Sequence, residues 1–456
     1  MTHVAVLDIG KTNVKLALVD TARRIELAVL TRPNIVLPGP PYPHYDVEGH
    51  WQFFLEGLAA LHKAHGIQAI SVTTHGASGV VLDVSGGLAA PVLDYEHSGP
   101  DALAAEYDAL RPPFAETGTA RMPGGLNLGA QLHWQMATDP GLGARIAQVV
   151  SYPGYWVHRL SGRAGFDLTS LGCHTDLWNP WKGCLSSLVP RLGLEGKIAA
   201  AVRPSDVAGP ILPEISAATG LAPGTPVVFG IHDSNASLLP HLLARHGAFA
   251  VVSTGTWLVA MAVGGHKVTL DPARDTLVNV NALGAPTPSA KVMGGREYEV
   301  LMAGHAPEAT EADARQVLDQ RLFYLPNAHP GSGPWPERVG GWQGGEPMGG
   351  ARAVAVGFYL ALVAAECLSM IGADGPVVVE GPFARNPWFV RMLATATGRV
   401  VEVSASQTGT AIGAALLADP GSTGTSANAS AQVVLPEGAW ATYARDWRSV
   451  LRSTLC

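Results

Sequence analysis

The sequence predicts an α/β protein built from two related domains. The chain has 456 residues, which is more than one hydrophobic core usually supports. A strand-like apolar run that breaks into a turn of glycine, hydroxyl and amide residues occurs twice, at 4–19 and at 247–262. Such a pattern is typical of a β-hairpin with an exposed tip. Because one copy lies near the start of each half of the chain, we expect two related domains that face one nucleotide.

The composition is that of a globular protein with ample material for a core, at 47% hydrophobic and 15% charged residues. The net charge of −7 argues against a nucleic-acid partner, so an anionic cosubstrate must be drawn by local donors and a metal ion. The four cysteines show no Cys-x-x-Cys spacing, which predicts reduced thiols rather than a zinc site or a disulfide framework. The chain reaches Asp8 and Lys11 too soon for a signal-peptide core, so we expect a cytoplasmic protein.

The most apolar stretch, 353–371, has two interpretations, a membrane span or a buried helix. It contains Glu366, and a charged group at bilayer depth is costly. We therefore predict a buried helix and no association with a membrane.

The first domain is expected to open as an antiparallel meander of strands at 4–7, 14–19 and 25–30, followed by a helix at 50–64 and a buried strand at 69–73. The segment 102–223 is richer in loops and helices, including 127–136 and 152–160. A buried strand then ends at Gly230, and a helix runs from Asp233 to about 245. The boundary belongs between 240 and 247, which predicts domains at 1–243 and 244–456.

The second domain begins with the second meander, at 247–262. The long Gly- and Pro-containing segment 284–350 is expected to form ordered loops, since Trp335 and Trp342 need burial or a partner. The small, polar stretch 420–430 is predicted to be a mobile surface loop.

Both hairpin turns are candidate phosphate sites. Glycine lets the backbone take a positive φ and lets an anion approach the amides, and hydroxyl and lysine side chains add donors. Asp8 suits such a site only if a cation lies between it and the phosphate, which suggests Mg²⁺. It could also cap its own turn, and Lys11 could reach the phosphate or form a solvated tip. The candidates are Gly10, Lys11, Thr12, Asn13 and Lys15 in the first hairpin and Thr254, Gly255 and Thr256 in the second.

The order of three motifs resembles the FGGY carbohydrate kinases of the actin, hexokinase and Hsp70 superfamily. These motifs are the Asp8-x-Gly10 hairpin, Gly230-x-His232-Asp233 and Ser253-Thr254-Gly255-Thr256. The resemblance runs almost end to end, because 377–388 and 407–415 are similar to that family's adenosine-binding region and closing helix. It implies two RNase-H-like (actin-like ATPase) domains flanking a deep catalytic cleft. Within the family, the motifs look most like the rhamnulokinase and fuculokinase branch.

Phosphoryl transfer requires positioning, charge stabilisation and a base that accepts the hydroxyl proton. The residues alone leave Asp233 open as a base at the end of a buried strand or as a helix N-cap. The resemblance implies that Asp233 is the catalytic base and that Asp8 orients Mg²⁺. His232 is expected to bond a sugar hydroxyl or to hold Asp233, with ordinary packing as the alternative.

At the adenosine site this chain departs from the family, since Glu380-Gly381-Pro382 stands where two or three glycines are common. Proline fixes φ near about −65° and removes an N–H. The nucleotide is still expected to stack over this turn. The candidate contacts are Gly381, Pro382, Phe383 and Asn386.

Sugar recognition needs convergent hydroxyl partners and often an aromatic wall. Each candidate could instead serve ordinary packing or a turn. Many family members carry a Trp-x-Asp-x-Arg-like pattern where 94–97 stands here, and the arginine is missing, so no sugar specificity transfers. The candidates are His75, Gly76, Asp94, Gln131, Tyr155, Trp156, His232 and Asp233.

The sequence thus predicts a kinase that uses ATP and Mg²⁺ to phosphorylate a primary hydroxyl of a ketose such as L-rhamnulose or L-fuculose. One alternative is a different ketose or polyol: xylulose, ribulose, erythrulose, glycerol or erythritol. Another is a sensor of sugar or nucleotide that kept the fold without turnover. The sequence leaves a homodimer possible.

Overall fold

The computed structural model describes residues 3–305, 307–404, 409–419, 421 and 432–454, which form two units. The first unit groups 1–245 with 278–286 and 408–427, and the second groups 246–277, 287–407 and 428–456. The division at 245 lies two residues beyond the expected boundary at 243, but the sequence did not indicate the two returns of the chain to the first unit. Except for Gly421, the expected surface loop at 420–430 lies outside the described residues, as do Gln407 and Thr408 of the closing motif.

The core of the first unit is a mixed sheet in the order β13-β14-β6-β1-β2-β3, with β15 beside β6. The first three strands form the expected antiparallel meander, and β6 and β14 run parallel to β1. The strands are β1 (His3–Ile9), β2 (Asn13–Asp20), β3 (Ile25–Pro33), β6 (Ala69–Thr74), β13 (Val207–Pro210), β14 (Pro226–Val228) and β15 (Ile231–His232).

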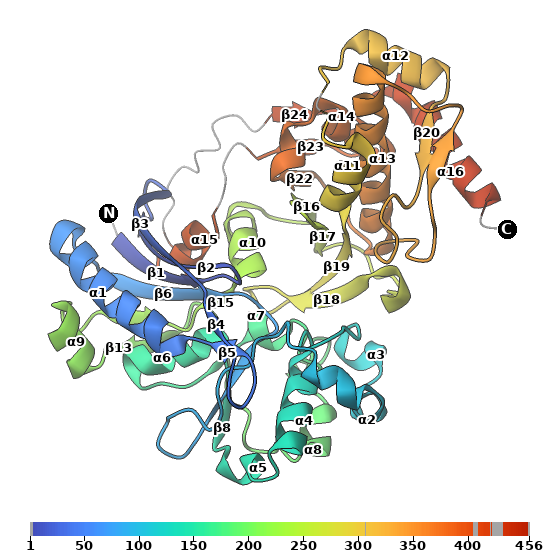
Figure 1. Cartoon of the computed structure of the whole chain (residues 1–456). Helices are drawn as coiled ribbons and strands as arrows, with labels where there is room; N and C mark the ends of the chain where they lie inside the picture. The colour runs from blue at the N-terminus through green and yellow to red at the C-terminus, as the bar shows by residue number, and fades with distance from the viewer. Residues whose placement is uncertain (1–2, 306, 405–408, 420, 422–431, 455–456) are drawn as a thin grey trace. The chain divides into compact units, whose positions relative to one another are not determined.

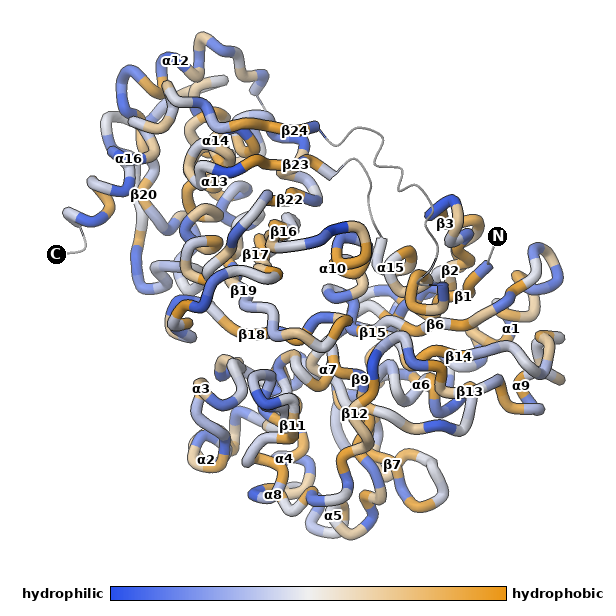
Figure 2. Tube along the Cα trace, turned by 180° about the vertical axis from the view of Figure 1, so that it is seen from behind, coloured by the Kyte–Doolittle hydropathy of each residue, from blue (hydrophilic) through white to orange (hydrophobic). Residues whose placement is uncertain are grey.

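Helices cover both faces of this sheet (Figure 1). α1 (Val47–His65) and α6 (Tyr152–Ser161) lie on one face, and α10 (Asp233–Ala244) and α15 (Thr410–Leu416) lie on the other. Because both faces are covered, β1 is buried from Val4 to its end instead of alternating. The sheet strands β6 and β14 accordingly stand out as hydrophobic in Figure 2.

Shorter elements complete the first unit, mostly within residues 99–219. The helices expected at 127–136 and 152–160 are present as α4 and α6. The short helices are η1 (Gly99–Leu103), α2 (Ala104–Leu110), α3 (Phe114–Thr117), α4 (Leu128–Thr138), α5 (Leu142–Arg145), α7 (Leu168–Leu171), α8 (Leu188–Arg191) and α9 (Pro213–Thr219). The short strands are β4 (Val36–Leu37), β5 (His44–Tyr45), β7 (Gly79–Leu82), β8 (Gln148–Ser151), β9 (Phe166–Asp167), β10 (Trp178–Asn179), β11 (Cys184–Leu185) and β12 (Ala201–Val202).

The main sheet of the second unit repeats the pairing of the first. Its order is β18-β19-β17-β16-β22-β23-β24. β16, β17 and β19 form an antiparallel meander, and β22 and β23 run parallel to β16 as β6 and β14 do to β1. This repetition supports the interpretation that the two halves are related domains. The remaining strand bounds are β16 (Phe249–Thr254), β17 (Leu258–Val263), β18 (Thr276–Val280), β19 (Pro286–Val292), β20 (Phe323–Leu325), β21 (Gly341–Gln343), β22 (Val377–Glu380), β23 (Val401–Val403) and β24 (Gln432–Val434). Residues 278–280 of β18 and residue 286 of β19 belong to the segment 278–286 that groups with the first unit.

The central helix of the second unit is α13 (Gly349–Met370), which contains most of the apolar stretch seen in the sequence. It is long and apolar enough to cross a membrane, yet 78% of its most apolar window is buried inside the protein. α13 is therefore a core helix, as predicted. The other helices are α11 (Gly294–Met302), α12 (Glu311–Asp319), α14 (Pro387–Thr397), α16 (Gly438–Ser453), η2 (Pro272–Arg274) and η3 (Pro382–Arg385).

Candidate active site

Three strands of the first unit, β1, β6 and β15, end side by side. Ile9 lies opposite Thr74, and Thr74 lies opposite His232. The carboxyl edge of parallel strands is where open α/β sheets place their ligands. The residues that directly follow the three strands are Gly10, His75 and Asp233. The structure thus brings three separate sequence motifs to one edge of the sheet.

Asp233 is the first residue of α10, and its side chain keeps about a third of its surface, 33%, exposed. Its Oδ1 accepts a hydrogen bond from Ser234 N at 2.6 Å and lies 3.1 Å from His232 Nε2. The N-cap of α10 is His232, so the alternative role of Asp233 as an N-cap is not what the structure shows. Its place in the first helical turn favours a negative charge through the helix dipole.

His232 is buried against Asp233. Burial lowers its pKa, but the neighbouring Cys173 and Asp233 side chains raise it, and the raising effects are the larger. A protonated imidazole at this position can donate a hydrogen bond to the Asp233 carboxylate, whose Oδ1 lies 3.1 Å away.

Asp8 is buried near the end of β1, with 6% of its surface exposed. Its Oδ2 accepts a hydrogen bond from Thr410 Oγ1 at 3.0 Å. Burial raises the pKa of Asp8 to about 6, against the opposing charge of Lys15, its cross-strand partner, and the charge of Asp233 adds to the increase. Asp8 and Asp233 therefore form a pair of interacting carboxylates beside the first hairpin.

The two hairpin turns use their glycine amides internally. Gly10 N donates to Asn13 O at 2.9 Å, and Gly255 N donates to Trp257 O at 2.9 Å. Neither glycine has a positive φ, so the expectation that these turns need glycine for that conformation was wrong. A phosphate at either turn would have to use other amides or side chains. In the first hairpin, the side chains left exposed are those of Thr12, Asn13 and Lys15.

Aromatic residues enclose His75 beside the edge of the sheet. Its ring centroid lies 5.1 Å from that of Tyr45, 5.2 Å from Tyr95 and 5.3 Å from Tyr152. Burial lowers the pKa of His75, which keeps the imidazole neutral at pH 7. Gly76 follows, and a Cβ at this position would lie 2.5 Å from His232 Nε2, so this glycine permits the close approach of the His232 ring to the backbone.

Lys11 and Asp94 extend this group of residues. Lys11 Nζ forms an ion pair with Asp94 Oδ1, and Tyr45 OH donates to the same oxygen at 3.0 Å. Lys11 is thus not a solvated hairpin tip. Tyr45 and Tyr152 were not predicted from the sequence, because isolated aromatic residues resemble core residues until the fold is known.

Three predicted sugar contacts lie elsewhere in the first unit. Trp156 is 0% exposed and packs against Trp51 and Phe54 in the core. Tyr155 is also buried, and its hydroxyl accepts from Arg159 at 3.1 Å. Both lie on the apolar face of α6, which explains why they bury their rings.

Gln131 is buried on α4, and its Nε2 donates to the carbonyls of Ala77 and Gly125. It therefore fixes the loop that follows His75 rather than presenting its donors to a ligand. Asn127 is the N-cap residue of α4, and its side chain holds the preceding loop: Oδ1 accepts from Met122 N at 2.8 Å and Nδ2 donates to Ala120 O at 3.0 Å.

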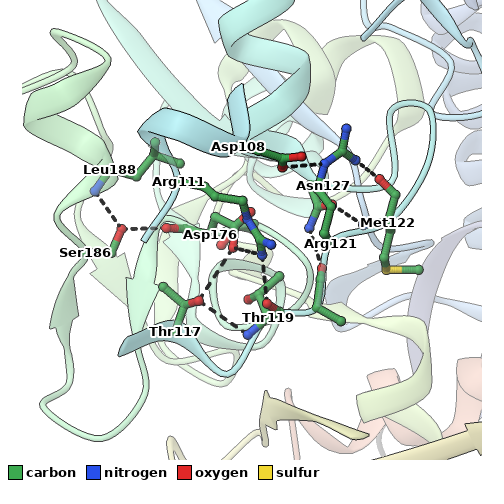
Figure 3. Close-up of polar contacts among 12 residues, drawn as sticks. Asp108, Arg111, Thr117, Thr119, Arg121, Met122, Asn127, Asp176, Ser186 and Leu188 are labelled. Atoms are coloured by element: carbon green, nitrogen blue, oxygen red, sulfur yellow. Dashed lines mark hydrogen bonds and ion pairs between the residues drawn. The ribbon is translucent and has the colours of Figure 1, made fainter. Parts of the chain in front are cut away.

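A buried ion pair holds the helical segments of this part together (Figure 3). Asp176 has no exposed side-chain surface, and its carboxylate accepts from Tyr107 OH at 2.6 Å and from Arg111 at 3.1 Å. Arg111 also donates to Thr119 O at 2.9 Å. These contacts join the end of α2 to the loop between α7 and β10, which carries Asp176, and to the loop that leads into α4. Sequence patterns did not reveal them.

In the second unit, a cavity of about 680 Å³ contains five of the predicted cofactor contacts. They come from the second hairpin and from the turn after β22: Gly255, Thr256, Pro382, Phe383 and Asn386. The size suits a small-molecule ligand. Pro382 is the first residue of η3, where a missing N–H leaves no bond unmade, and this explains the departure from glycine.

Gly381 and Thr254 join the two walls of this cavity. Gly381 has a φ of 82°, and a Cβ on it would lie 1.9 Å from Thr254 O. Thr254 is buried, and its hydroxyl accepts from Phe383 N at 3.1 Å. Asn386 caps α14 by accepting from Trp388 N at 3.0 Å. These three residues therefore shape the cavity, and Asn386 also lines it.

One wall of the cavity was not predicted from the sequence; α11 supplies it through Gly295 and Tyr298. Gly295 N donates to Thr256 O at 3.1 Å, so the start of this helix packs directly on the second hairpin. The Gly294-Gly295 pair after β19 is the signal that the sequence offers for this wall, but it lies in the segment 284–350, for which the sequence predicts loops and the structure shows α11.

The family comparisons agree with this arrangement. The N-terminal domain of the FGGY family of carbohydrate kinases matches residues 3–240, and the C-terminal domain of carbohydrate kinase FGGY matches residues 246–426. Together the matches cover most of the sequence. The chain belongs to the FGGY family of carbohydrate kinases.

Two curated relatives are named for different sugars. L-fuculokinase of Salmonella typhi is 24% identical over 273 residues, which are 58% of this chain and 57% of that protein. A probable L-xylulose kinase of Pasteurella multocida (strain Pm70) is 24% identical over 287 residues, with the same coverage of 58% and 57%. The chain therefore matches little more than half the length of each of these relatives.

Solved structures are similar over the whole chain. A carbohydrate kinase from Novosphingobium aromaticivorans is 35% identical, with a TM-score of 0.91 and coverage of 100% of both chains. Xylulose kinase from Rhodospirillum rubrum is 24% identical, with a TM-score of 0.78 and coverage of 99% of both chains, a likeness that shows the fold alone. The protein thus has the two-domain FGGY kinase fold.

Proposed function

We propose that this chain transfers the γ-phosphate of ATP to a primary hydroxyl of a ketose. The observation that supports this most directly is the convergence of Asp233, His75 and the Lys11–Asp94 pair at the edge of the sheet that also holds Asp8. Kinases of this family use ATP, and the cavity of the second unit is lined by the residues expected to hold it.

In this proposal Asp233 accepts the proton of the sugar hydroxyl, and His232, whose Nε2 lies 3.1 Å from Asp233 Oδ1, orients its carboxylate. Asp94 and His75 bind other hydroxyls, with Tyr95 as part of the aromatic wall. Positioning and charge stabilisation are the main demands of phosphoryl transfer, so a preorganised set of buried polar side chains suits this task.

Mg²⁺ fits the donor set at Asp8. Among the described residues, no group of three or more His, Cys, Asp or Glu side chains could hold a metal alone. Mg²⁺ commonly uses one or two carboxylates together with substrate phosphates and water. Asp8, with Asp233 nearby, offers this kind of incomplete site, and the ion would neutralise charge on the phosphates.

The acceptor is proposed to be a ketose of the L-fuculose, L-rhamnulose or xylulose kind. The fuculokinase and L-xylulose kinase relatives are equally similar at 24% identity, so they support these alternatives equally. A polyol such as glycerol or erythritol is the second candidate, because the site can distinguish a ketose from a polyol only by individual hydrogen bonds to hydroxyl groups.

The test is a coupled ADP-release assay with MgATP and a panel of five ketoses and one polyol, namely L-fuculose, L-rhamnulose, L-xylulose, D-xylulose, D-ribulose and glycerol. We expect one panel member to stimulate ADP release. Asp233→Asn should reduce the stimulated rate by a factor of about 10² to 10⁴, the range that general bases contribute. Glu195→Gln, at an exposed carboxylate, is the matched control.

An intact rate in Asp233→Asn would contradict the assignment of the base. Bound ATP with no stimulation by any panel member would favour the sensor alternative over the kinase.

A further inference from the structure

The Lys11 side chain leaves the first hairpin and enters a set of acidic and aromatic residues. Its Nζ is paired with Asp94 Oδ1 and lies 3.2 Å from Glu96 Oε2. It also lies 4.8 Å from the ring centroid of Tyr95 and 5.4 Å from that of Tyr45. With two carboxylates and two ring faces around it, this ammonium group has the partners that a cation needs within the first unit itself.

The arrangement leaves one oxygen of Asp94 available. Oδ1 accepts from Lys11 Nζ, from Tyr45 OH at 3.0 Å and from Glu96 N at 3.2 Å. All hydrogen bonds that the described residues donate to this carboxylate fall on Oδ1. Oδ2 can therefore accept a hydrogen bond from a ligand hydroxyl, and charge-assisted bonds of this kind are among the stronger ones.

A continuous set of contacts joins Lys11 to Asp233. Tyr95 lies under the Lys11 ammonium group and packs edge-on against His75 at 5.2 Å. The Gly76 backbone approaches His232, whose Nε2 lies 3.1 Å from Asp233 Oδ1. Asp94 is thus fixed in the same group of side chains as the proposed base.

We propose that Lys11 is a positioning residue of the acceptor site, which holds Asp94 so that its free oxygen binds a hydroxyl of the sugar. This inference rests on the proposed function. Lys11 does not act on the phosphates, because its charge is already balanced by Asp94 and Glu96 and leaving them would unpair two acidic groups. The pair of carboxylates around one lysine also leaves a net negative charge, which selects a neutral polyhydroxylated acceptor over a sugar acid.

The test compares Lys11→Met, which keeps the length of the stem but removes the charge, with Lys11→Arg, which keeps the charge. We expect Lys11→Met to raise KM for the acceptor ketose about tenfold while KM for ATP stays within about twofold. Lys11→Arg should recover most of the acceptor affinity. Lys182→Met, at an exposed lysine of the β10–β11 turn, is the matched control.

A second measurement is independent of turnover. The affinity for a nonhydrolysable ATP analogue, measured by calorimetry on the full chain, should be the same in the original protein and in Lys11→Met. A tenfold loss of this affinity, or a rise in KM for ATP with an unchanged KM for the acceptor, would overturn the proposal and place Lys11 on the phosphates.

Failure of the proposed function has a different signature. In that case the original protein turns over no panel sugar. The comparison of ATP-analogue affinity between the original protein and Lys11→Met then still decides whether Lys11 acts on the phosphates. Turnover of D-gluconate at a rate equal to that of the best ketose would overturn the selection of a neutral acceptor.

Discussion

Thr410 Oγ1 donates a hydrogen bond to Asp8 Oδ2 at 3.0 Å, which joins two residues 402 positions apart in the sequence. The contact ties α15 to the end of β1, and Ser71 Oγ on β6 donates to Ala414 O of the same helix at 2.7 Å. α15 therefore packs on the sheet of the first unit beside the first hairpin. It also helps to bury a carboxylate that the proposed function needs.

Replacing Asp8 with asparagine should stabilise the fold and strongly reduce activity. The pKa of Asp8 is raised from 3.8 to about 6, so the folded protein binds this proton more tightly than the unfolded chain does. The resulting stabilisation is fully present below about pH 4 and is lost as the pH rises through 6. At pH 7.5 the charged carboxylate thus costs up to about 3 kcal/mol, which Asp8→Asn removes.

Thermal unfolding at pH 5 and at pH 7.5 tests this prediction. The gain in Tm for Asp8→Asn should be larger at pH 7.5, while kcat falls by a factor of 10² or more, as expected of a group that orients Mg²⁺. A gain that is the same at both pH values would contradict the raised pKa.

Gly381→Ala should destabilise the second unit and weaken ATP binding. The new Cβ would lie 1.9 Å from Thr254 O at a φ of 82°, so both a clash and backbone strain arise. We expect a loss of about 3 kcal/mol or more in the free energy of unfolding. Gly398→Ala is the matched control, since its φ is 67° and nothing lies within 4 Å. Gly398→Ala should therefore lower the free energy of unfolding by only about 1 kcal/mol. Denaturant titrations measure both variants, and an equal loss of stability in the two would show that the structure relieves the clash at Gly381.

Arg111→Met should destabilise the first unit strongly, because it leaves the fully buried Asp176 carboxylate without its cationic partner. Breaking a buried ion pair from one side costs about 3–5 kcal/mol. The double variant Arg111→Met/Asp176→Asn should recover part of this loss. Chemical denaturation of the single and double variants measures the difference, and a double variant less stable than Arg111→Met would argue against the pair.

Trp156→Phe should lower stability without changing sugar recognition. Trp156 is 0% exposed and packs in the core, so the smaller ring leaves a cavity that costs about 1–3 kcal/mol. KM for the acceptor should stay within about twofold of its original value. Tyr95→Leu, which removes an aromatic neighbour of His75, should raise it several-fold. A higher acceptor KM in Trp156→Phe at unchanged Tm would restore the sequence-based assignment.

The sequence by itself determined the two related α/β domains, the two hairpins and the three motifs that end buried strands. These features are local, since each depends on the periodicity of apolar residues and on turn chemistry within a short window. For the same reason the helices α1, α4, α6, α10 and α13 were expected close to where they lie. The family resemblance added roles for Asp8 and Asp233 that spacing alone left open.

Only the tertiary structure decided which polar and aromatic residues meet. Lys11 pairs with Asp94 across 83 positions of sequence, and Thr410 with Asp8 across 402. Such contacts depend on strand order and helix docking, which no local pattern encodes. The same applies to Trp156 and Tyr95: an aromatic ring near a site and one in the core look alike in sequence, and only packing separates them.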